Sequence, residues 1–399
     1  MAEISTGKAC ASLVATRPQE KILEFIDHLI EESTPNAPAW NIEHKLMGKK
    51  AAWNYIDGCM TKAVLDVYYA TANEKYFDFV ENYIGFFLQS DGILGYKIED
   101  YNCDNINMGK VLFDLYKKTK DEKHKKAINL LMKQLKTHPR ISMGNFWHKL
   151  IYPNQVWLDG LYMVQPFYMA YEMNFNEKQN YKDIFAQFEN ARNIMRDSET
   201  GLYFHGYDES KSMFWANNST GLSSNFWTRS IGWFAMALVD TLEQFDEQFF
   251  YEYETLQKWL KELLDAVLAY EYNNMFWQVT NKGNQEGNYL ETSGSCAIAY
   301  SLMKGARKGY LPAFYFERGL NIFESVAKNK LTIKDGKIEL ADICLVAGLG
   351  GMPGQGDYKE RDGSFEYYIS EPKVSNDAKG VAPFLFCFAE VLQKKEGYA

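Results

Sequence analysis

One aspartate stands among aromatic residues in the most informative stretch of the sequence. Asp159 lies between Trp157 and Tyr162 and is followed by Gly160, at the expected start of a helix. Burial against the two aromatic rings would disfavour the ionised form and raise the pKa of the Asp159 carboxyl, which makes a carboxylic acid usable as a general acid near neutral pH. The competing interpretation is an aspartate that only caps its helix.

Similar side chains precede other expected helix starts. They are Trp53, Tyr55 and Asp57; Asp104 and Asn105; Gln155 and Trp157; Trp227 and Arg229; Glu291 and Ser293; and Asn376, Asp377 and Lys379. Indole rings stack on sugar faces, and carboxylates and amides bond to hydroxyl groups, so this set indicates a carbohydrate cleft. For each single residue, packing or capping at a rim is the alternative.

Cationic side chains accompany this acidic set. His148-Lys149 and Arg229 are expected beside the rim, where a lone cation usually pairs with a carboxylate. Together with His205, which lies in Phe204-His-Gly-Tyr-Asp208, they would instead clamp the carboxylate of a sugar.

The elements that would position these residues form a repeat along the chain. Six helices that are apolar nearly all round are expected to start at Gly58, Gly109, Gly160, Gly232, Gly294 and Gly380. Amphipathic helices alternate with them, and two of these follow Thr-x-x-Glu capping boxes at Thr71 and Thr119. Because a helix without a polar face must be enclosed by others, the pattern predicts an all-α fold, an (α/α)6 barrel of six inner and six outer helices. The N termini of the inner helices would surround one mouth, and Pro166 and Pro383 should kink or shorten two of them.

Length and charge limit the class of protein. The 399 residues, 46% of them hydrophobic, are expected to form a single barrel domain over residues 1–399, with 1–20 as a loosely ordered N-terminal extension. A net charge of -9 and a pI near 5.4 argue against nucleic acid or membrane partners and favour a small-molecule substrate. With no recognisable secretory signal or membrane span, we expect a cytoplasmic protein, monomeric or homodimeric, whose cysteines are reduced.

Several competing chemistries lack their motifs. The sequence has no His-Glu-x-x-His and no paired cysteines at ligand spacing, so we expect neither a metal site nor a cofactor. It also has no Gly-x-Ser-x-Gly elbow for a serine nucleophile. The glycine-rich segment 348–356 has Pro353 where the last glycine of a dinucleotide motif would stand, and we interpret it as a mobile loop at the rim.

Several segments together form a pattern that is specific as a set. In chain order they are Phe146-Trp-His-Lys149, Tyr152-Pro-Asn-Gln-Val-Trp-Leu-Asp-Gly-Leu-Tyr-Met163, Phe204-His-Gly-Tyr-Asp208, Phe226-Trp-Thr-Arg229 with Gly232-Trp233, Glu291-Thr-Ser293 and Arg361-Asp-Gly-Ser-Phe-Glu-Tyr-Tyr368. This set resembles the unsaturated rhamnogalacturonyl hydrolases of glycoside hydrolase family 105. The resemblance runs from about Trp53 to the end of the chain. It implies an (α/α)6 barrel that acts on disaccharides left by pectin lyases and carrying a 4,5-unsaturated galacturonyl residue at the non-reducing end.

The resemblance also implies a mechanism and a set of site residues. Asp159 matches the family aspartate that protonates C4 of the enol ether and then, as a carboxylate, activates water to attack C5. Asp104 matches the second aspartate, which contacts substrate hydroxyls and would help to keep Asp159 protonated by like-charge repulsion. His205, Arg229 and Trp233 match positions around the unsaturated ring. The full set of expected substrate-binding residues is Tyr55, His148, Lys149, Trp157, His205, Trp227, Arg229 and Trp233, with His148 and Lys149 toward the second sugar.

One departure and three alternatives accompany this interpretation. Thr228 stands where a glycine is expected before Arg229, and Ser230 and Ile231 replace a smaller or more polar pair. Unsaturated glucuronyl hydrolases of family 88 share the barrel and the aspartates but act on glycosaminoglycan fragments. A sugar epimerase or isomerase would use His148 and His205 as a facing acid and base. A non-catalytic sugar-binding protein would keep the tryptophans and would not need Asp159.

Overall fold

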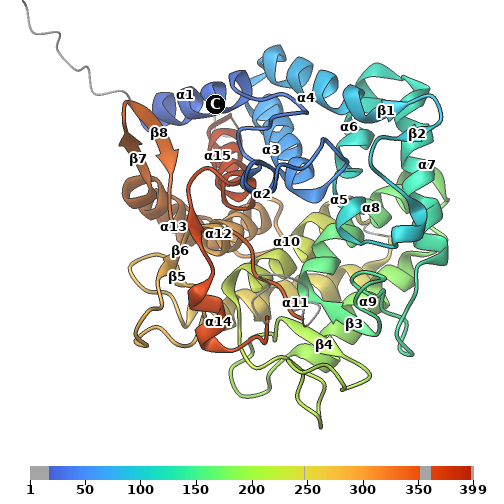
Figure 1. Ribbon diagram of the computed structural model, residues 1–399, viewed down its shortest axis with the longest axis vertical. Coiled ribbons are helices and arrows are strands. Elements are labelled where there is room, and N and C mark those ends of the chain that lie inside the picture. The colour runs from blue at the N-terminus through green and yellow to red at the C-terminus, as the bar shows by residue number, and fades with distance from the viewer. Residues whose placement is uncertain (1–17, 247, 351–360, 397–399) are drawn as a thin grey trace, which may run out of the picture.

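Six helices form a closed inner ring over residues 18–246, 248–350 and 361–396, which are the residues that the computed structural model describes (Figure 1). They are α3 (Tyr55–Thr71), α6 (Lys110–Thr119), α8 (Leu158–Phe175), α10 (Thr228–Gln244), α12 (Thr292–Arg307) and α15 (Ala378–Glu396). Each packs against the next, and α15 closes the ring against α3. The outer helices are α1 (Pro18–Glu31), α4 (Glu74–Phe87), α7 (Glu122–Thr137), α9 (Tyr181–Met195), α11 (Phe250–Leu268) and α13 (Phe314–Lys330). The predicted (α/α)6 barrel is confirmed.

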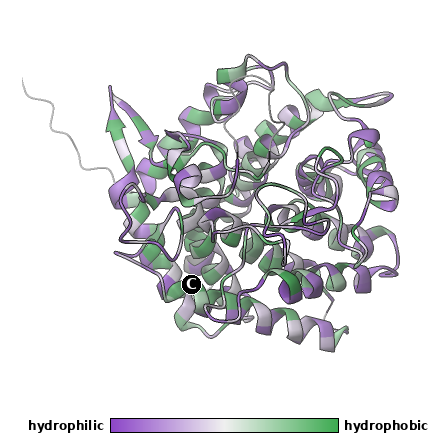
Figure 2. Ribbon diagram, turned by 60° about the horizontal axis from the view of Figure 1, so that its bottom comes forward, coloured by the Kyte–Doolittle hydropathy of each residue, from purple (hydrophilic) through white to green (hydrophobic). Residues whose placement is uncertain are grey.

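Hydrophobic periodicity explains which helices are inside. In α12 every residue from Thr292 to Gly305 is buried, so this helix has no wet face. In α7, by contrast, Ile128, Leu131 and Leu135 are buried at three- and four-residue steps, and lysines occupy much of the remaining surface. Figure 2 shows the same division, with hydrophobic residues gathered toward the middle of the molecule and hydrophilic ones along the outside.

The helix-start glycines lie where neighbouring helices approach closely. Most inner helices begin two to four residues before the expected glycine, and α6 begins one residue after Gly109. A methyl group added to Gly232 would lie 2.7 Å from Ala297 Cβ, and one added to Gly294 would lie 2.7 Å from Thr228 Cγ2. These glycines therefore allow α10 and α12 to touch through their first turns.

The predicted capping boxes are wrong. Thr71 and Thr119 are the last residues of α3 and α6, and their hydroxyls donate back to a carbonyl one turn earlier. The outer helices α4 and α7 are capped instead by Asn73 and Asp121, whose side chains accept from the backbone N–H two residues further on. The two copies of the repeat nevertheless agree with each other in every one of these bonds.

The prolines do not end their helices. Pro166 lies inside α8 and Pro383 inside α15, and both helices continue past them. Neither proline therefore shortens its inner helix, and the expected kink stays a prediction.

Short connections between the helices surround the mouth of the barrel. They include α2 (Ile42–Met47), η1 (Ile98–Asp100), α5 (Asp104–Asn107) and α14 (Phe365–Ser370). Five antiparallel two-stranded ladders join β1 (Leu88–Gln89) to β2 (Gly92–Ile93), β3 (Gln155–Trp157) to β4 (Gly206–Asp208), β5 (Phe276–Trp277) to β6 (Leu290–Glu291), β7 (Leu331–Lys334) to β8 (Lys337–Leu340), and β9 (Ile343–Cys344) to β10 (Lys373–Val374). Because β3 and β6 run directly into α8 and α12, these ladders fix the first turns of two inner helices.

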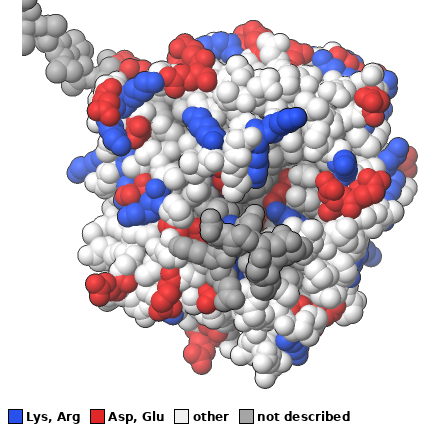
Figure 3. Space-filling view, viewed as in Figure 1, with Lys and Arg blue, Asp and Glu red and all other residues white. Residues whose placement is uncertain are grey.

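The remaining expectations concern surface charge, membrane-spanning helices, the N-terminal extension and the rim loop. Basic and acidic side chains are interspersed on the face in Figure 3, which has the orientation of Figure 1. Among the described helices none is long and apolar enough to cross a membrane. Residues 1–17 of the expected N-terminal extension, and 351–356 of the expected rim loop, lie outside the described residues.

Candidate active site

Asp159 lies in the first turn of α8, at the mouth of the barrel. The cap residue of α8 is Trp157, which makes no side-chain capping bond, so Asp159 is not a capping residue. Pairing of β3 with β4 sets Trp157 opposite Gly206, and the backbone N–H of Leu158 donates to the carbonyl of His205. The ladder thus brings Nε2 of His205 to 3.1 Å from Oδ2 of Asp159.

The pKa of Asp159 is lowered in the ligand-free protein. Burial acts to raise it, but the His205 ring, by charge and by hydrogen bonding, and more weakly His148, outweigh burial. The start of α8 adds the partial positive charge of a helix N terminus. The predicted rise of the pKa is therefore wrong, because His205 is far from Asp159 in the sequence and only the β3–β4 ladder places it against the carboxylate.

His205 is held from its other side by Tyr368, a residue of α14. His205 Nδ1 lies 2.7 Å from the Tyr368 hydroxyl, and both side chains are fully buried. Burial keeps the pKa of Tyr368 well above its usual value, so the hydroxyl retains its proton and can donate it to Nδ1. The remaining ring proton then belongs to Nε2, the atom that faces Asp159. No site role for Tyr368 was predicted, although the segment 361–368 was part of the family resemblance.

The second aspartate, Asp104, carries a paired charge. Lys149 Nζ lies 2.6 Å from Asp104 Oδ2, and His148 Nε2 lies 3.6 Å from Oδ1. Burial lowers the pKa of His148 to about 4, so its ring is neutral at neutral pH, and the interpretation of His148 as a cation is wrong. The Lys149 pairing offsets the negative charge of Asp104, and Asp104 is not among the main influences on the pKa of Asp159. The predicted repulsion between the two aspartates is therefore not supported.

Trp157 joins the two halves of the site. The His148 ring stacks on it at 4.4 Å between centroids, the Tyr152 ring at 4.9 Å, and His205 meets it at 5.5 Å, edge to face. The absence of a side chain at Gly160 permits this, because a Cβ there would lie 3.0 Å from His148 Nδ1. Trp157 is 6% exposed, and these ring contacts orient both histidines.

Arg229 is a buried guanidinium with no carboxylate within 4.0 Å among the described residues. Its Nη1 donates to the Cys344 carbonyl at 2.6 Å and to the Ser293 hydroxyl at 3.3 Å, and its Cζ lies 4.7 Å from the Trp227 ring centroid. Its Nε has no partner in the described part of the chain. The salt-bridge interpretation of Arg229 is therefore wrong, and the guanidinium keeps donor capacity for an anion.

The Thr228 departure has a structural role of its own. The Thr228 hydroxyl bonds to the carbonyl of Trp277 and to the Thr280 hydroxyl, 2.7 Å away, and its methyl group packs on Gly294. The side chain is thus fixed against β5 and α12.

The last two expected residues lie at different depths. Tyr55 is half-buried at the start of α3, and burial together with Glu43 and Asp104 raises its pKa while Arg229 opposes the rise, which places its hydroxyl among these charges. Trp233 lies one turn beyond Arg229, is 1% exposed and stacks on Tyr162 at 4.8 Å. The structure therefore brings Tyr55, Asp104, His148, Lys149, Trp157, Asp159, His205, Trp227 and Arg229 to one mouth, with Trp233 beneath them.

Comparisons with known proteins agree with this fold. The sequence model of Glycosyl Hydrolase Family 88 matches residues 27–395. A solved family 105 glycoside hydrolase from C. acetobutylicum ATCC 824 is 40% identical over 94% of this chain and 99% of its own, with a TM-score of 0.84. The chain therefore belongs to the group of unsaturated glycuronyl hydrolases formed by families 88 and 105, and it is an enzyme that hydrolyses glycosides.

Two curated proteins and a further structure extend the comparison. Protein Atu3128 of Agrobacterium fabrum is 37% identical over 233 residues, which are 57% of this chain and 97% of that protein. Unsaturated rhamnogalacturonyl hydrolase YesR of Bacillus subtilis is 25% identical over 295 residues, covering 72% of this chain and 77% of YesR. An unsaturated glucuronyl hydrolase specific for heparin has a TM-score of 0.65 at 11% identity, which shows a shared fold alone.

Proposed function

We propose that the protein removes the 4,5-unsaturated galacturonyl residue from the non-reducing end of rhamnogalacturonan-derived disaccharides, with Asp159 as the proton donor. The similarity to YesR and to the family 105 structure supports this substrate class. The observation that carries the chemistry is the arrangement of the two aspartates. Lys149 neutralises Asp104, while the charge partner of Asp159 among the described residues is a histidine, His205, so one carboxyl group would act as both acid and base. Ordinary glycosidases divide these tasks between two carboxyl groups.

The proposed reaction begins at the double bond. Protonated Asp159 gives its proton to C4, and the positive charge that develops at C5 is shared with the ring oxygen. Asp159, now a carboxylate, takes a proton from a water molecule that attacks C5. The resulting hemiketal opens to a ketone, and C1, which has become a hemiacetal, expels the second sugar.

Substrate binding raises the pKa of Asp159, so that the carboxylate takes up from water the proton that it lacks in the free enzyme. Arg229 has unused donors and is the proposed partner of the sugar carboxylate. A second negative charge beside Asp159, together with exclusion of water, disfavours the ionised form and raises its pKa in the complex. Trp227 forms the wall beside Arg229, Trp233 supports the floor, and Tyr55, His148, Lys149 and Asp104 bind hydroxyl groups toward the second sugar.

Two alternative functions, an epimerase and a glucuronyl hydrolase, can be weighed against specific observations. His148 and His205 contact the same ring, Trp157, and do not face each other across the mouth as an epimerase would require. A glucuronyl substrate of the family 88 type remains the second candidate, favoured by the match of the Family 88 model over most of the chain. The cytoplasmic location and the monomeric or dimeric state stay predictions.

The test follows the ultraviolet absorbance of the conjugated double bond on an unsaturated rhamnogalacturonan disaccharide and on its unsaturated glucuronyl counterpart. We expect the first signal to decay faster. Decay of the second alone would transfer the proposal to glycosaminoglycan fragments, and decay of neither would end it.

The variant Asp159→Asn tests the role of the carboxyl group. It keeps the size of the side chain but has no proton to give, so we expect kcat to fall by about 10³-fold or more while disaccharide binding, measured by calorimetry, is retained. Asp197→Asn is a matched control, since the Asp197 carboxylate accepts hydrogen bonds from Thr200 in a loop and was not assigned to the site. A variant at Asp159 with parental turnover would leave a sugar-binding protein as the better description.

A further inference from the structure

A second cavity lies at the end of the barrel opposite Asp159. Its volume is about 530 Å³, and all six inner helices contribute to its wall. On α8 the wall residues extend from Pro166 to Phe175, seven to sixteen residues beyond Asp159, which at the rise of a helix is about 10 to 24 Å. This cavity, here called the distal pocket, is therefore separate from the site at the mouth.

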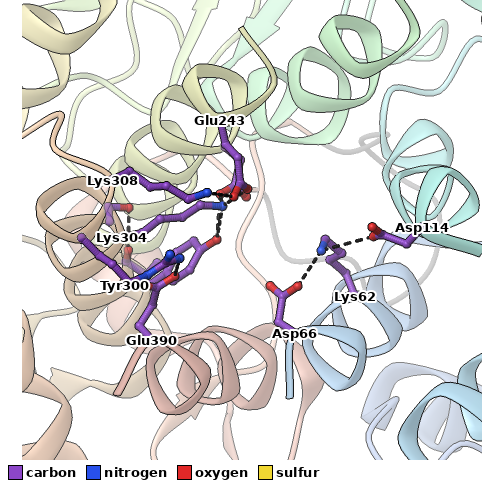
Figure 4. Close-up of polar contacts among 12 residues, drawn as sticks. Lys62, Asp66, Asp114, Glu243, Tyr300, Lys304, Lys308 and Glu390 are labelled. Atoms are coloured by element: carbon purple, nitrogen blue, oxygen red, sulfur yellow. Dashed lines mark hydrogen bonds and ion pairs between the residues drawn. The ribbon is translucent and has the colours of Figure 1, made fainter. Parts of the chain in front are cut away.

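Two ion-paired clusters face each other across the distal pocket (Figure 4). In one, Lys304 Nζ lies 2.7 Å from Asp240 and 2.6 Å from Glu243, and Lys308 lies 2.7 Å from Glu243. In the other, Lys62 lies between Asp66 at 2.6 Å and Asp114 at 3.4 Å. The first of these clusters has two ammonium groups and two carboxylates, whereas the second has one ammonium group and two carboxylates.

Lys110 is the buried exception. Its Nζ has no hydrogen-bond partner and no carboxylate within 4.0 Å among the described residues, although the residue is only 8% exposed. The ammonium lies 3.5 Å from the ring centroid of Tyr162, whose hydroxyl also lacks a partner in the described part of the chain. A cation over a ring is stabilised, but its N–H groups still lack acceptors.

The partial charges of the helix ends do not explain why an ammonium group is buried at Lys110. Lysines in the last turns of α6 and α12 complement the partial negative charge of those helix C termini. Lys110 is the first residue of α6, where the helix carries partial positive charge, so its own charge is unfavourable there. An anion that entered the pocket would compensate a buried ammonium in such a place.

The composition of the wall limits what that anion is. Five acidic side chains line the pocket with seven basic ones, and the carboxylates would repel a ligand with several negative charges. The same carboxylates accept hydrogen bonds from hydroxyl groups. Phe113 and Phe175, whose rings stack at 5.9 Å, add an apolar wall of the kind on which a sugar face packs.

We propose that the distal pocket binds a small sugar acid, with its single carboxylate on Lys110 and its hydroxyl groups on the ion-paired walls. The assignment does not rest on the reaction proposed for Asp159, because none of the residues that line the distal pocket is among the proposed catalytic or substrate-binding residues.

Calorimetric titration of the full chain with D-galacturonate tests the assignment. We expect saturable binding that weakens at least tenfold in Lys110→Met and is unchanged in Lys117→Met, which alters an exposed lysine of the same pocket. Neutral D-galactose should bind at least tenfold more weakly than galacturonate. Equal binding of galactose, or equal affinity of the Lys110→Met variant, would overturn the proposal, as would binding of inorganic phosphate without galacturonate.

A measurement on the parent protein covers the case in which Lys110→Met does not fold. Acetylation of lysines is followed by mass spectrometry with and without ligand. Galacturonate should slow acetylation of Lys110 at least fivefold and leave Lys117 unchanged, whereas galactose should protect neither. Protection of neither lysine by galacturonate would contradict the assignment.

Discussion

At the scale of single residues, the chemistry of this enzyme depends on how two atoms of one histidine are used. His205 Nε2 faces Asp159, and Nδ1 is occupied by Tyr368. The contact lowers the pKa of Asp159 in the free enzyme, yet the proposed reaction starts from the protonated acid. Binding of the substrate therefore has to reverse the direction of the shift.

This reversal predicts a difference between two pH profiles. The active form is protonated Asp159, so activity is lost as pH rises through the pKa of this group. The pH profile of kcat/KM reports the pKa of Asp159 in the free enzyme, and the profile of kcat reports its pKa in the complex. The alkaline limb of kcat should therefore lie at higher pH than the alkaline limb of kcat/KM. Stopped-flow and steady-state measurements on the unsaturated disaccharide provide both profiles. Coincident alkaline limbs would show that the substrate does not change the pKa of Asp159.

Tyr368 is a positioning residue in this arrangement. In Tyr368→Phe the His205 ring can carry its proton on Nδ1, which turns a lone pair of Nε2 toward the Asp159 carboxylate. We expect kcat to fall by about 10- to 100-fold, and the alkaline limb of kcat/KM to move to higher pH because the ionised carboxylate loses its donor.

The neighbouring Tyr367→Phe is the matched control. It loses a bond from the backbone of Gly348 and not one to His205, so the pH profile should stay in place. If both variants shift the profile equally, the effect belongs to packing of α14 and not to the histidine.

The family resemblance identified most residues of the site, but not their partners. The contacts His205–Asp159 and Lys149–Asp104 join residues that are 45 or more positions apart in the sequence. They depend on the conformations of loops and on a ladder of three residues per strand, which is too short to produce a recognisable alternation. For this reason the direction of the Asp159 pKa could not be obtained from neighbouring residues alone.

At the scale of elements, the sequence was informative where burial is periodic and misleading where local motifs are ambiguous. The alternation of enclosed and amphipathic helices follows from hydrophobic periodicity, which is a direct consequence of which face is buried. The pattern Thr-x-x-Glu at Thr71 and Thr119 fits two structures equally well. One is a capping box, and the other is the end of a helix followed, two residues later, by the capping residue of the next helix. Only the backbone path distinguishes these possibilities, because Ala72 and Lys120 leave the helices in the left-handed conformation.

The corrected caps make a stability prediction. Asp121→Ala removes the acceptor for the N–H of Lys123 at the start of α7, and we expect a loss of about 1 kcal/mol in the free energy of unfolding. Asp121→Asn retains a capping oxygen and should lose much less. Urea denaturation followed by circular dichroism measures both. A neutral Asp121→Ala variant would favour Thr119 as the true cap.

At the scale of the whole molecule, the closed ring separates two polar ends. Asp159 and Arg229 stand in the first turns of α8 and α10, the stacked pair Tyr162 and Trp233 lies one turn deeper, and Lys110 contacts Tyr162 on the way to the distal pocket. The aromatic pair thus lies between the substrate site and the buried lysine.

The uncompensated charge of Lys110 has a measurable cost. Burial, with Lys62 and Lys304 acting in the same direction and Cys59 and Asp240 opposing, lowers the pKa of Lys110 to about 8 from 10.5. Between these values the unfolded chain binds the proton and the folded protein does not, so stability of the parent rises with pH through this window. Below it the full penalty applies, at most about 3 kcal/mol.

We therefore expect Lys110→Met to be more stable than the parent at pH 7 and the difference to shrink toward pH 10. Calorimetric unfolding temperatures of both proteins at the two pH values measure this, with Lys117→Met as a variant that should show no such pH-dependent difference. Adding a sugar acid at pH 7 should narrow the gap, because the bound carboxylate compensates the ammonium in the parent alone. A variant that is less stable at pH 7, or a gap independent of pH, would mean that Tyr162 and the surrounding walls already satisfy the charge.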